Sequence, residues 1–168
     1  LLNIGPKPDG TIQKEFVDRL VAIGKWMDKY SDAIYGTTAS PFNLLPFYGR
    51  VTTKGDKLYV HVFEWPGDQI ARLPNLSNEI RKAYLLEKGK PKLEVERDGA
   101  DWLIKLPKKP TDKFASVLVV ELDGAPVVEP VVIGADAKGA ISLPALYGNL
   151  EGPHGQRIRY ESRDGVIH

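Results

Sequence analysis

The 168-residue sequence contains no cysteine. This absence excludes disulfide bonds, thiolate metal sites and a cysteine nucleophile together. Long hydrophobic runs are missing as well: the longest, such as Val117–Val120, have only a few residues. A bilayer-spanning helix needs about 20 apolar residues. We therefore expect no membrane span and no membrane partner.

An excess of charge of one sign is also missing. The chain has 23 Lys and Arg against 22 Asp and Glu, which gives a formal net charge of +1. Such a balance gives no electrostatic reason to expect binding to nucleic acid. Hydrophobic residues make up 42% and charged residues 27% of the chain, as in a typical globular domain.

Sequence motifs that carry chemistry are equally scarce. We find no P-loop, no dinucleotide-binding fingerprint and no G-x-S-x-G elbow. The three histidines, His61, His154 and His168, do not have the spacing of metal ligands. Most carboxylates stand beside Lys or Gly in turns, and their spacing singles out no catalytic pair. We therefore predict no cofactor and no metal site, and the residues alone identify no catalytic pair.

The N-terminal stretch has the pattern of a strand, a loop and a helix. Leu1–Ile4 is a short apolar run, typical of the end of a buried strand, and the turn-rich loop Gly5–Gly10 follows. Apolar residues then recur at spacings of four and three, which predicts a helix over Lys14–Tyr30. The residues of this stripe are Phe16, Leu20, Ile23, Met27 and Tyr30. Together these segments form a βα unit.

After Gly36 the helical period disappears. The segment 38–47 contains two prolines and reads as a connection. From Tyr48 to about Gly124 short strand patterns alternate with turn signals, which favours an antiparallel β-sandwich. The expected strands are the two flanking "KGD" ("GRVTT" and "KLYVHVFEW"), then Ile70–Leu73, Ile80–Leu86, Lys92–Arg97, Trp102–Leu106 and Ser116–Leu122. The predicted fold class is mainly β, an antiparallel sandwich preceded by a terminal βα unit.

One of these strands is apolar on both faces. Leu58, Val60 and Val62 share one face, and Tyr59, His61 and Phe63 share the other, so that we expect a central or doubly covered strand. In that setting His61 is predicted to be a packed, hydrogen-bonded histidine.

Two tryptophans and a group of lysines are the remaining candidates for binding. Trp65 and Trp102 could form a sugar-stacking platform, but their strand positions favour packing in the core or at a sheet edge. The basic cluster Lys105, Lys108, Lys109 and Lys113 surrounds turns, and we expect it to protect a sheet edge in solvent.

The last part of the chain, 125–168, differs from the rest. Residues 125–139 are rich in Pro, Gly and Val and read as a linker, after which alternating patterns begin again. We expect the start of a further β-rich module here, cut short at His168.

Several segments in the same order resemble α-L-fucosidases of glycoside hydrolase family 29. Three segments are similar to the last strand and helix of that family's (β/α)8-like catalytic barrel. They are "LLNIGPKPDGTI", Gly24–Trp26 and Asp32–Thr37. Three later segments resemble the family's C-terminal β-sandwich: "GRVTTKGDKLYVHVFEWP", "AYLLEKGKPKLEVERDG" and "ASVLVVELDG". The resemblance implies four regions: 1–37 as the last barrel unit, 38–47 as a connection, 48–124 as the sandwich, and 125–168 as linker and truncated module.

The resemblance implies a retaining enzyme that removes α-linked L-fucose from glycans. In the family, an Asp nucleophile forms a fucosyl-enzyme and a second carboxylic acid acts as acid/base, the logic of retaining hydrolysis. Those residues come from earlier barrel strands, so none is carried over to this chain. A fucosylated glycan would be the partner, bound by the missing barrel. Family resemblance also implies a secreted or periplasmic parent protein, whereas the oligomeric state is left open.

Only the N-terminal loop would lie near the barrel mouth. Asn3 could shape the edge of the substrate pocket, although hydrogen bonds between strand ends are the simpler role. Asp9 could touch a glycan, but turn formation ahead of the helix is favoured.

Three roles for the chain remain open from the sequence. It could be an inactive C-terminal piece of the enzyme, a glycan-binding module, or a purely structural sandwich that covers the barrel's flank. The structural role predicts that the apolar face of the helix Lys14–Tyr30 is left partly uncovered in this chain.

Overall fold

A computed structural model of the chain describes residues 4–130, 134, 137–141, 162–163 and 166–167. Of the predicted N-terminal strand, Leu1–Asn3 lie outside the described residues, and Ile4 belongs to no strand. The helix α1 spans Lys14–Tyr30, as the apolar stripe predicts, and the short 3-10 helix η1 (Ser31–Ala33) follows. After η1 the chain enters an antiparallel sandwich, so the predicted fold class is confirmed for this domain.

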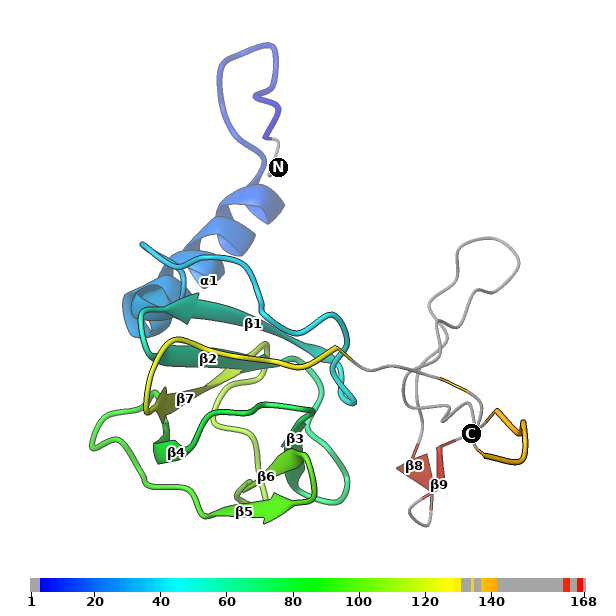
Figure 1. Ribbon diagram of the computed structural model, residues 1–168. Coiled ribbons are helices and arrows are strands. Elements are labelled where there is room, and N and C mark those ends of the chain that lie inside the picture. The colour runs from blue at the N-terminus through cyan, green and yellow to red at the C-terminus, as the bar shows by residue number, and fades with distance from the viewer. Residues whose placement is uncertain (1–3, 131–133, 135–136, 142–161, 164–165, 168) are drawn as a thin grey trace.

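Two antiparallel sheets form the sandwich (Figure 1). The first has the strand order β1-β2-β7-β4 and the second the order β3-β6-β5. The strands of the first sheet are β1 (Gly49–Lys54), β2 (Lys57–Val62), β7 (Ser116–Leu122) and β4 (Ile80–Leu85). Those of the second are β3 (Ile70–Leu73), β6 (Asp101–Lys105) and β5 (Val95–Asp98). A separate two-stranded ladder joins β8 (Ser162–Arg163) to β9 (Val166–Ile167).

Two predicted strands differ from the observed ones by more than one residue at an end. β2 ends at Val62, so the expectation that Phe63–Trp65 continue the strand is wrong. The predicted strand Lys92–Arg97 is divided between the sheets. The N–H of Leu93 donates to the carbonyl of Ala83 in β4, whereas Val95 already pairs with β6. The chain therefore changes sheets within this segment, as strands at sandwich corners do.

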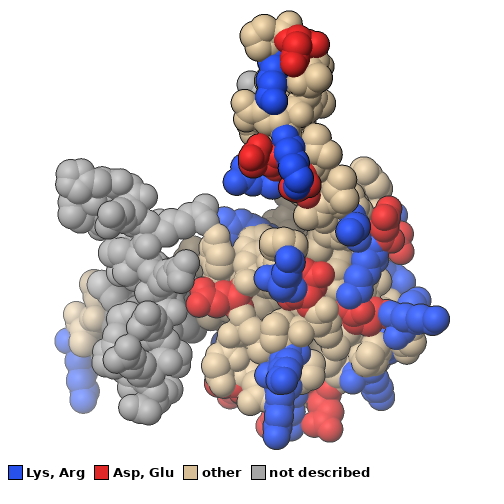
Figure 2. All heavy atoms as spheres, turned by 180° about the vertical axis from the view of Figure 1, so that it is seen from behind, with Lys and Arg blue, Asp and Glu red and all other residues tan. Residues whose placement is uncertain are grey.

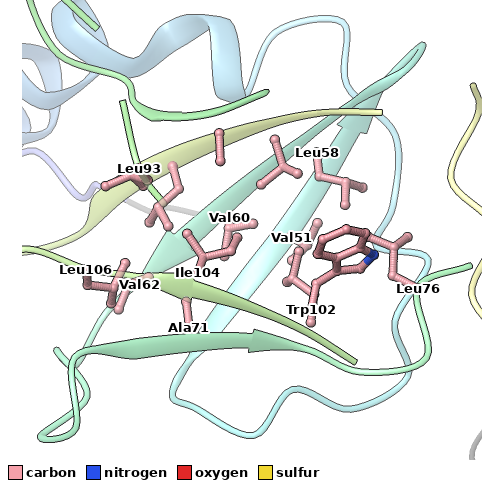
Figure 3. Packing of buried hydrophobic residues seen from close by; sticks show 14 of the residues in the cluster. Val51, Leu58, Val60, Val62, Ala71, Leu76, Leu93, Trp102, Ile104 and Leu106 are labelled. Atoms are coloured by element: carbon pink, nitrogen blue, oxygen red, sulfur yellow. The ribbon is translucent and has the colours of Figure 1, made fainter. Parts of the chain in front are cut away.

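The core lies between the two sheets (Figure 3). Leu58, Val60 and Val62 of β2 point toward Ala71 and Ile104 of the second sheet, and all five side chains are buried. Because β2 pairs with β1 on one side and β7 on the other, it is a central strand, as predicted. Burying this apolar surface supplies the main driving force for folding the domain.

The outer face of the four-stranded sheet carries a second apolar cluster. Here Tyr30 and Ala33, from the end of α1 and from η1, pack against Tyr59, Tyr84 and Val119. The sheet is thus covered on both faces, by the second sheet and by the end of the helix. Figure 1 shows that the N-terminal half of α1 extends beyond the sandwich.

Candidate functional site

The predicted pocket residue, Asn3, lies outside the described residues. Of the N-terminal loop, the structure describes Asp9 in a tight local turn. Its Oδ1 accepts hydrogen bonds from the backbone N–H of Thr11 at 3.0 Å and from the Thr11 hydroxyl at 2.7 Å. The hydroxyl bond, followed by the backbone bond, holds the pKa of Asp9 below its ordinary value. This geometry agrees with the turn-forming role expected for Asp9.

The contact between α1 and the sheet is the best-defined constellation of functional groups in the described residues. Trp26 projects from the helix and donates its indole N–H to the carbonyl oxygen of Ala115 at 2.9 Å. Its ring lies 4.9 Å from the ring of Tyr30, one helical turn later, and 6.1 Å from that of His61 on β2. These three side chains fix where the helix crosses the sheet.

A carboxylate fastens the last turn of the helix. The Tyr30 hydroxyl donates to Oε1 of Glu87 at 2.6 Å, and the Lys29 ammonium lies 2.7 Å from the same oxygen. Burial alone would raise the pKa of Glu87, but the hydrogen bonds from Lys29 and Tyr30 outweigh it and hold that pKa below its ordinary value. Glu87 therefore stays ionised and acts as a charged anchor for the helix.

His61 has the packed, hydrogen-bonded position predicted for it. Its Nε2 lies 3.3 Å from the Thr52 hydroxyl, which donates to the carbonyl oxygen of Ala33 at 2.6 Å. Burial lowers the pKa of His61 below 6.5, so the ring is neutral at pH 7. A neutral ring that donates from Nε2 completes a chain of hydrogen bonds from β2 through β1 to η1.

The two tryptophans proposed for sugar stacking are occupied inside the fold. Trp102 is buried in the sandwich core and donates its indole N–H to the carbonyl oxygen of Asn78 at 3.0 Å. Trp65 is partly buried against the same core, and its indole N–H donates to the carbonyl oxygen of Pro107 at 2.8 Å. The packing role predicted for both tryptophans agrees with these positions: Trp102 lies inside the core, and Trp65 packs against it from a partly exposed position.

Charged groups of both signs are mixed over the surface that Figure 2 shows. From the basic cluster, Lys105 lies 3.3 Å from Glu94 and 3.9 Å from Glu96, so this edge is an ion-pair network in solvent. Within the described ranges no group of three or more His, Asp or Glu side chains could hold a metal ion. No helix among them is long and apolar enough to cross a membrane.

Exposed apolar side chains gather on the part of α1 that leaves the sandwich. Val17, Val21 and Ile23 are each at least 40% exposed. The predicted partly uncovered helix face is therefore confirmed.

Sequence reasoning missed the anchoring role of Glu87. The residue lies 57 positions from Tyr30 in the sequence and belongs to a stretch rich in lysine, "LEKGKPK". No local pattern distinguishes it from the neighbouring solvated charges. The link through Thr52 was missed for the same reason, because its partner Ala33 contributes only a backbone carbonyl.

Comparisons with known proteins agree on one family. The model of the α-L-fucosidase family matches residues 1–32. An α-L-fucosidase of Dictyostelium discoideum is 38% identical over 100 residues, which cover 56% of this chain and 22% of that protein.

Two of the similar solved structures are bacterial fucosidases. The α-fucosidase of Thermotoga maritima, in complex with a mechanism-based inhibitor, is 31% identical with a TM-score of 0.62, covering 72% of this chain and 30% of the other. A family GH29 α-L-fucosidase of Bacteroides thetaiotaomicron, trapped as a covalent intermediate, is 27% identical with a TM-score of 0.65, covering 73% and 28%. The chain thus spans less than a third of each of these three proteins.

Proposed function

We propose that this chain, which resembles the C-terminal part of an α-L-fucosidase of glycoside hydrolase family 29, serves as the structural β-sandwich of such an enzyme. The parent protein would hydrolyse α-linked L-fucose from glycans. Support comes from the agreement of the family match, the curated relatives and the solved structures on this one activity.

The parent is inferred to react with retention of configuration. The Thermotoga relative was captured with a mechanism-based inhibitor and the Bacteroides relative as a covalent intermediate. A covalent glycosyl-enzyme is the intermediate of retaining hydrolysis, in which one carboxylate attacks the sugar and a second carboxylic acid protonates the leaving group. In this proposal both carboxylates belong to the part of the parent that this chain does not include.

The observation that carries the structural role is the division of α1 into two halves. Its last turns are fastened to the sheet by Trp26 and Tyr30, while Val17 and Val21 remain exposed. A helix whose C-terminal turns are bound to the sandwich, and whose N-terminal half exposes apolar side chains, is suited to connecting two domains. The sandwich would hold one end of the helix and so brace the catalytic domain that covers the other.

A glycan-binding role for the sandwich lacks a comparable observation. The two tryptophans on which that alternative depended are engaged in packing and in hydrogen bonds to backbone carbonyls. A titration of the chain with fucosylated oligosaccharides that gave saturable binding would reinstate this alternative.

The proposal is tested by assaying the 168-residue chain and the full-length parent with an aryl α-L-fucoside. We expect the parent to release the chromogenic phenol and the chain to release none above background, because the two carboxylates are absent from the chain. Fucose release by the purified chain would overturn its structural assignment. A parent without activity would overturn the fucosidase assignment.

A further inference from the structure

A tripeptide in the loop between β3 and β4 has the pattern of an acceptor for N-linked glycans. Asn75, Leu76 and Ser77 form the sequence Asn-x-Ser, and the central residue is not proline. The other asparagines in the sequence, at positions 3, 43, 78 and 149, have neither Ser nor Thr two residues later. Because a pattern of three residues also arises by chance, the surroundings of Asn75 decide whether it is suited to carry a glycan.

The backbone of this loop is held by hydrogen bonds on both sides of the motif. The N–H of Asn75 donates to Oδ1 of Asp101 at 3.1 Å, and its carbonyl oxygen accepts from the N–H of Glu129 at 3.0 Å. The N–H of Ser77 donates to the carbonyl oxygen of Val127 at 2.9 Å. Asn75 has a φ of 50°, which asparagine adopts more readily than most residues. These bonds fix the loop through its backbone and leave the side chains of Asn75 and Ser77 unused.

The two side chains that define the motif reach solvent, whereas the one between them does not. Leu76 is fully buried in the sandwich core, and Ser77 is exposed. Among the described residues, the Thr111 hydroxyl is the only buried side-chain nitrogen or oxygen atom without a hydrogen bond. The Asn75 carboxamide has no hydrogen bond to these residues either, so it must be accessible to solvent. A sugar attached to its Nδ2 atom would therefore break no hydrogen bond of the described fold.

The motif lies at the end of the sandwich that is remote from the exposed half of α1. Figure 3 shows Leu76 beside Trp102, at the opposite end of the core from Val62. The last turn of α1 packs against the middle of β2, and Trp26, one turn earlier, lies beside His61, next to Val62. The earlier turns of the helix therefore extend past the Val62 end of β2. A bulky group on the loop between β3 and β4 would leave the helix free.

We propose that Asn75 is the acceptor for an N-linked glycan when the chain passes through a glycosylating secretory compartment. The donor is an oligosaccharide joined to a polyprenyl lipid through a diphosphate. The Nδ2 atom of Asn75 forms a bond to the anomeric carbon of the first sugar, and the bond from that carbon to the diphosphate oxygen breaks. The amide loses one proton to a base of the transferase, and the lipid diphosphate is the leaving group. This modification goes beyond the proposed function, because it does not involve fucoside hydrolysis.

The test directs the 168-residue chain, behind a cleavable leader peptide, into the secretory pathway of a eukaryotic host cell. Secreted and retained protein are both purified and analysed by mass spectrometry, and removal of the leader shows that the chain has entered the compartment. We expect an added oligosaccharide on Asn75, which peptide N-glycosidase removes while converting that residue to Asp. Asn78, three residues later, is the internal control and should stay unmodified.

Two substitutions of the exposed Ser77 separate the motif from its position. Ser77→Ala removes the hydroxyl that the motif requires and should abolish the modification, whereas Ser77→Thr keeps a hydroxyl and should retain it. Neither change touches Asn75, so its backbone conformation is preserved in both variants. A chain without its leader that carries no glycan, or a glycan that persists in Ser77→Ala, would overturn the proposal.

Calorimetry then shows whether the folded sandwich accommodates the glycan. We expect the glycosylated and the enzymatically deglycosylated chains to unfold within about 1 °C of each other, because changes at exposed positions alter stability little. A glycosylated chain that lacks a cooperative transition would show that Asn75 is accessible only before folding, and the proposal would fail. No step requires catalysis by the chain, so a parent that does not hydrolyse fucosides would refute the proposed function and leave this result unchanged.

Discussion

At the scale of single residues, His61 makes the domain sensitive to pH. Burial lowers its pKa in the folded chain below the ordinary value of 6.5, which the unfolded chain retains. As the pH falls through 6.5, the unfolded state binds a proton that the folded state does not, so folding stability decreases. Above that pH the stability contribution of the neutral ring is fully present. A protonated ring would also face Arg50, its cross-strand neighbour.

We predict that His61→Gln reduces this pH dependence. Urea unfolding at pH 7.5 and pH 5.5 should show a larger loss of unfolding free energy for the unsubstituted chain than for the variant. His154 and His168 are present in both proteins, and the carboxyl groups mostly titrate at lower pH, so these groups cancel from the difference. Parallel pH profiles for the two proteins would show that His61 is not the responsible group.

The environment of His61 was predictable only in part. Strand alternation and the apolar residues on both faces of the strand indicated a packed histidine. The partners through which it acts, Thr52 and the carbonyl of Ala33, come from segments that meet only after folding. Every residue has a backbone carbonyl, so the identity of Ala33 does not indicate that its carbonyl accepts this hydrogen bond. This part of the site could therefore not be predicted from the sequence.

At the scale of elements, the end of α1 depends on the charged hydrogen bond between Tyr30 and Glu87. We predict that Tyr30→Phe lowers the unfolding free energy by about 1–2 kcal/mol, since the ring packing remains and a hydrogen bond to a charged group is lost. Tyr35→Phe is the control, because Tyr35 is 66% exposed, and it should change stability by less than about 0.5 kcal/mol. Urea unfolding of both variants at pH 7 measures the difference. Equal effects at the two positions would contradict the anchoring role.

The elements themselves were largely predictable because their apolar periods are regular. The apolar stripe with a period of 3.6 residues predicted the bounds of α1 that the structure shows. Alternating apolar residues between turn signals predicted where the strands lie. The failure at Lys92–Arg97 has a physical cause. Residues near Leu93 pair with β4 and those from Val95 pair with β6, and both partners suit the same alternating pattern. Periodicity reports which residues are extended, but not with which strand they pair.

At the scale of the whole molecule, one sheet organises two apolar clusters. Alternate residues of β7 enter opposite clusters: Leu118 lies in the sandwich core, whereas Val119 lies beneath the end of α1. A continuous apolar run such as that of β7 is typical of a strand covered on both faces, but it does not indicate that a helix end forms the second cover. The sandwich core and the attachment of the helix therefore use opposite faces of the same strand.

We predict that the two faces of β7 can be separated by substitution. Leu118→Ala should lower the global unfolding free energy by about 2–5 kcal/mol, because it leaves a cavity in the sandwich core. Val119→Ala removes less apolar volume and should cost about 2 kcal/mol. Hydrogen exchange distinguishes the variants further. Only Val119→Ala should allow the amides around Tyr30 to exchange by a local opening that leaves the sandwich strands protected, since Val119 packs in the cluster beneath the helix end. If Leu118→Ala released the helix to the same extent at matched stability, the two clusters would form one cooperative unit, and the sandwich could not act as an independent brace.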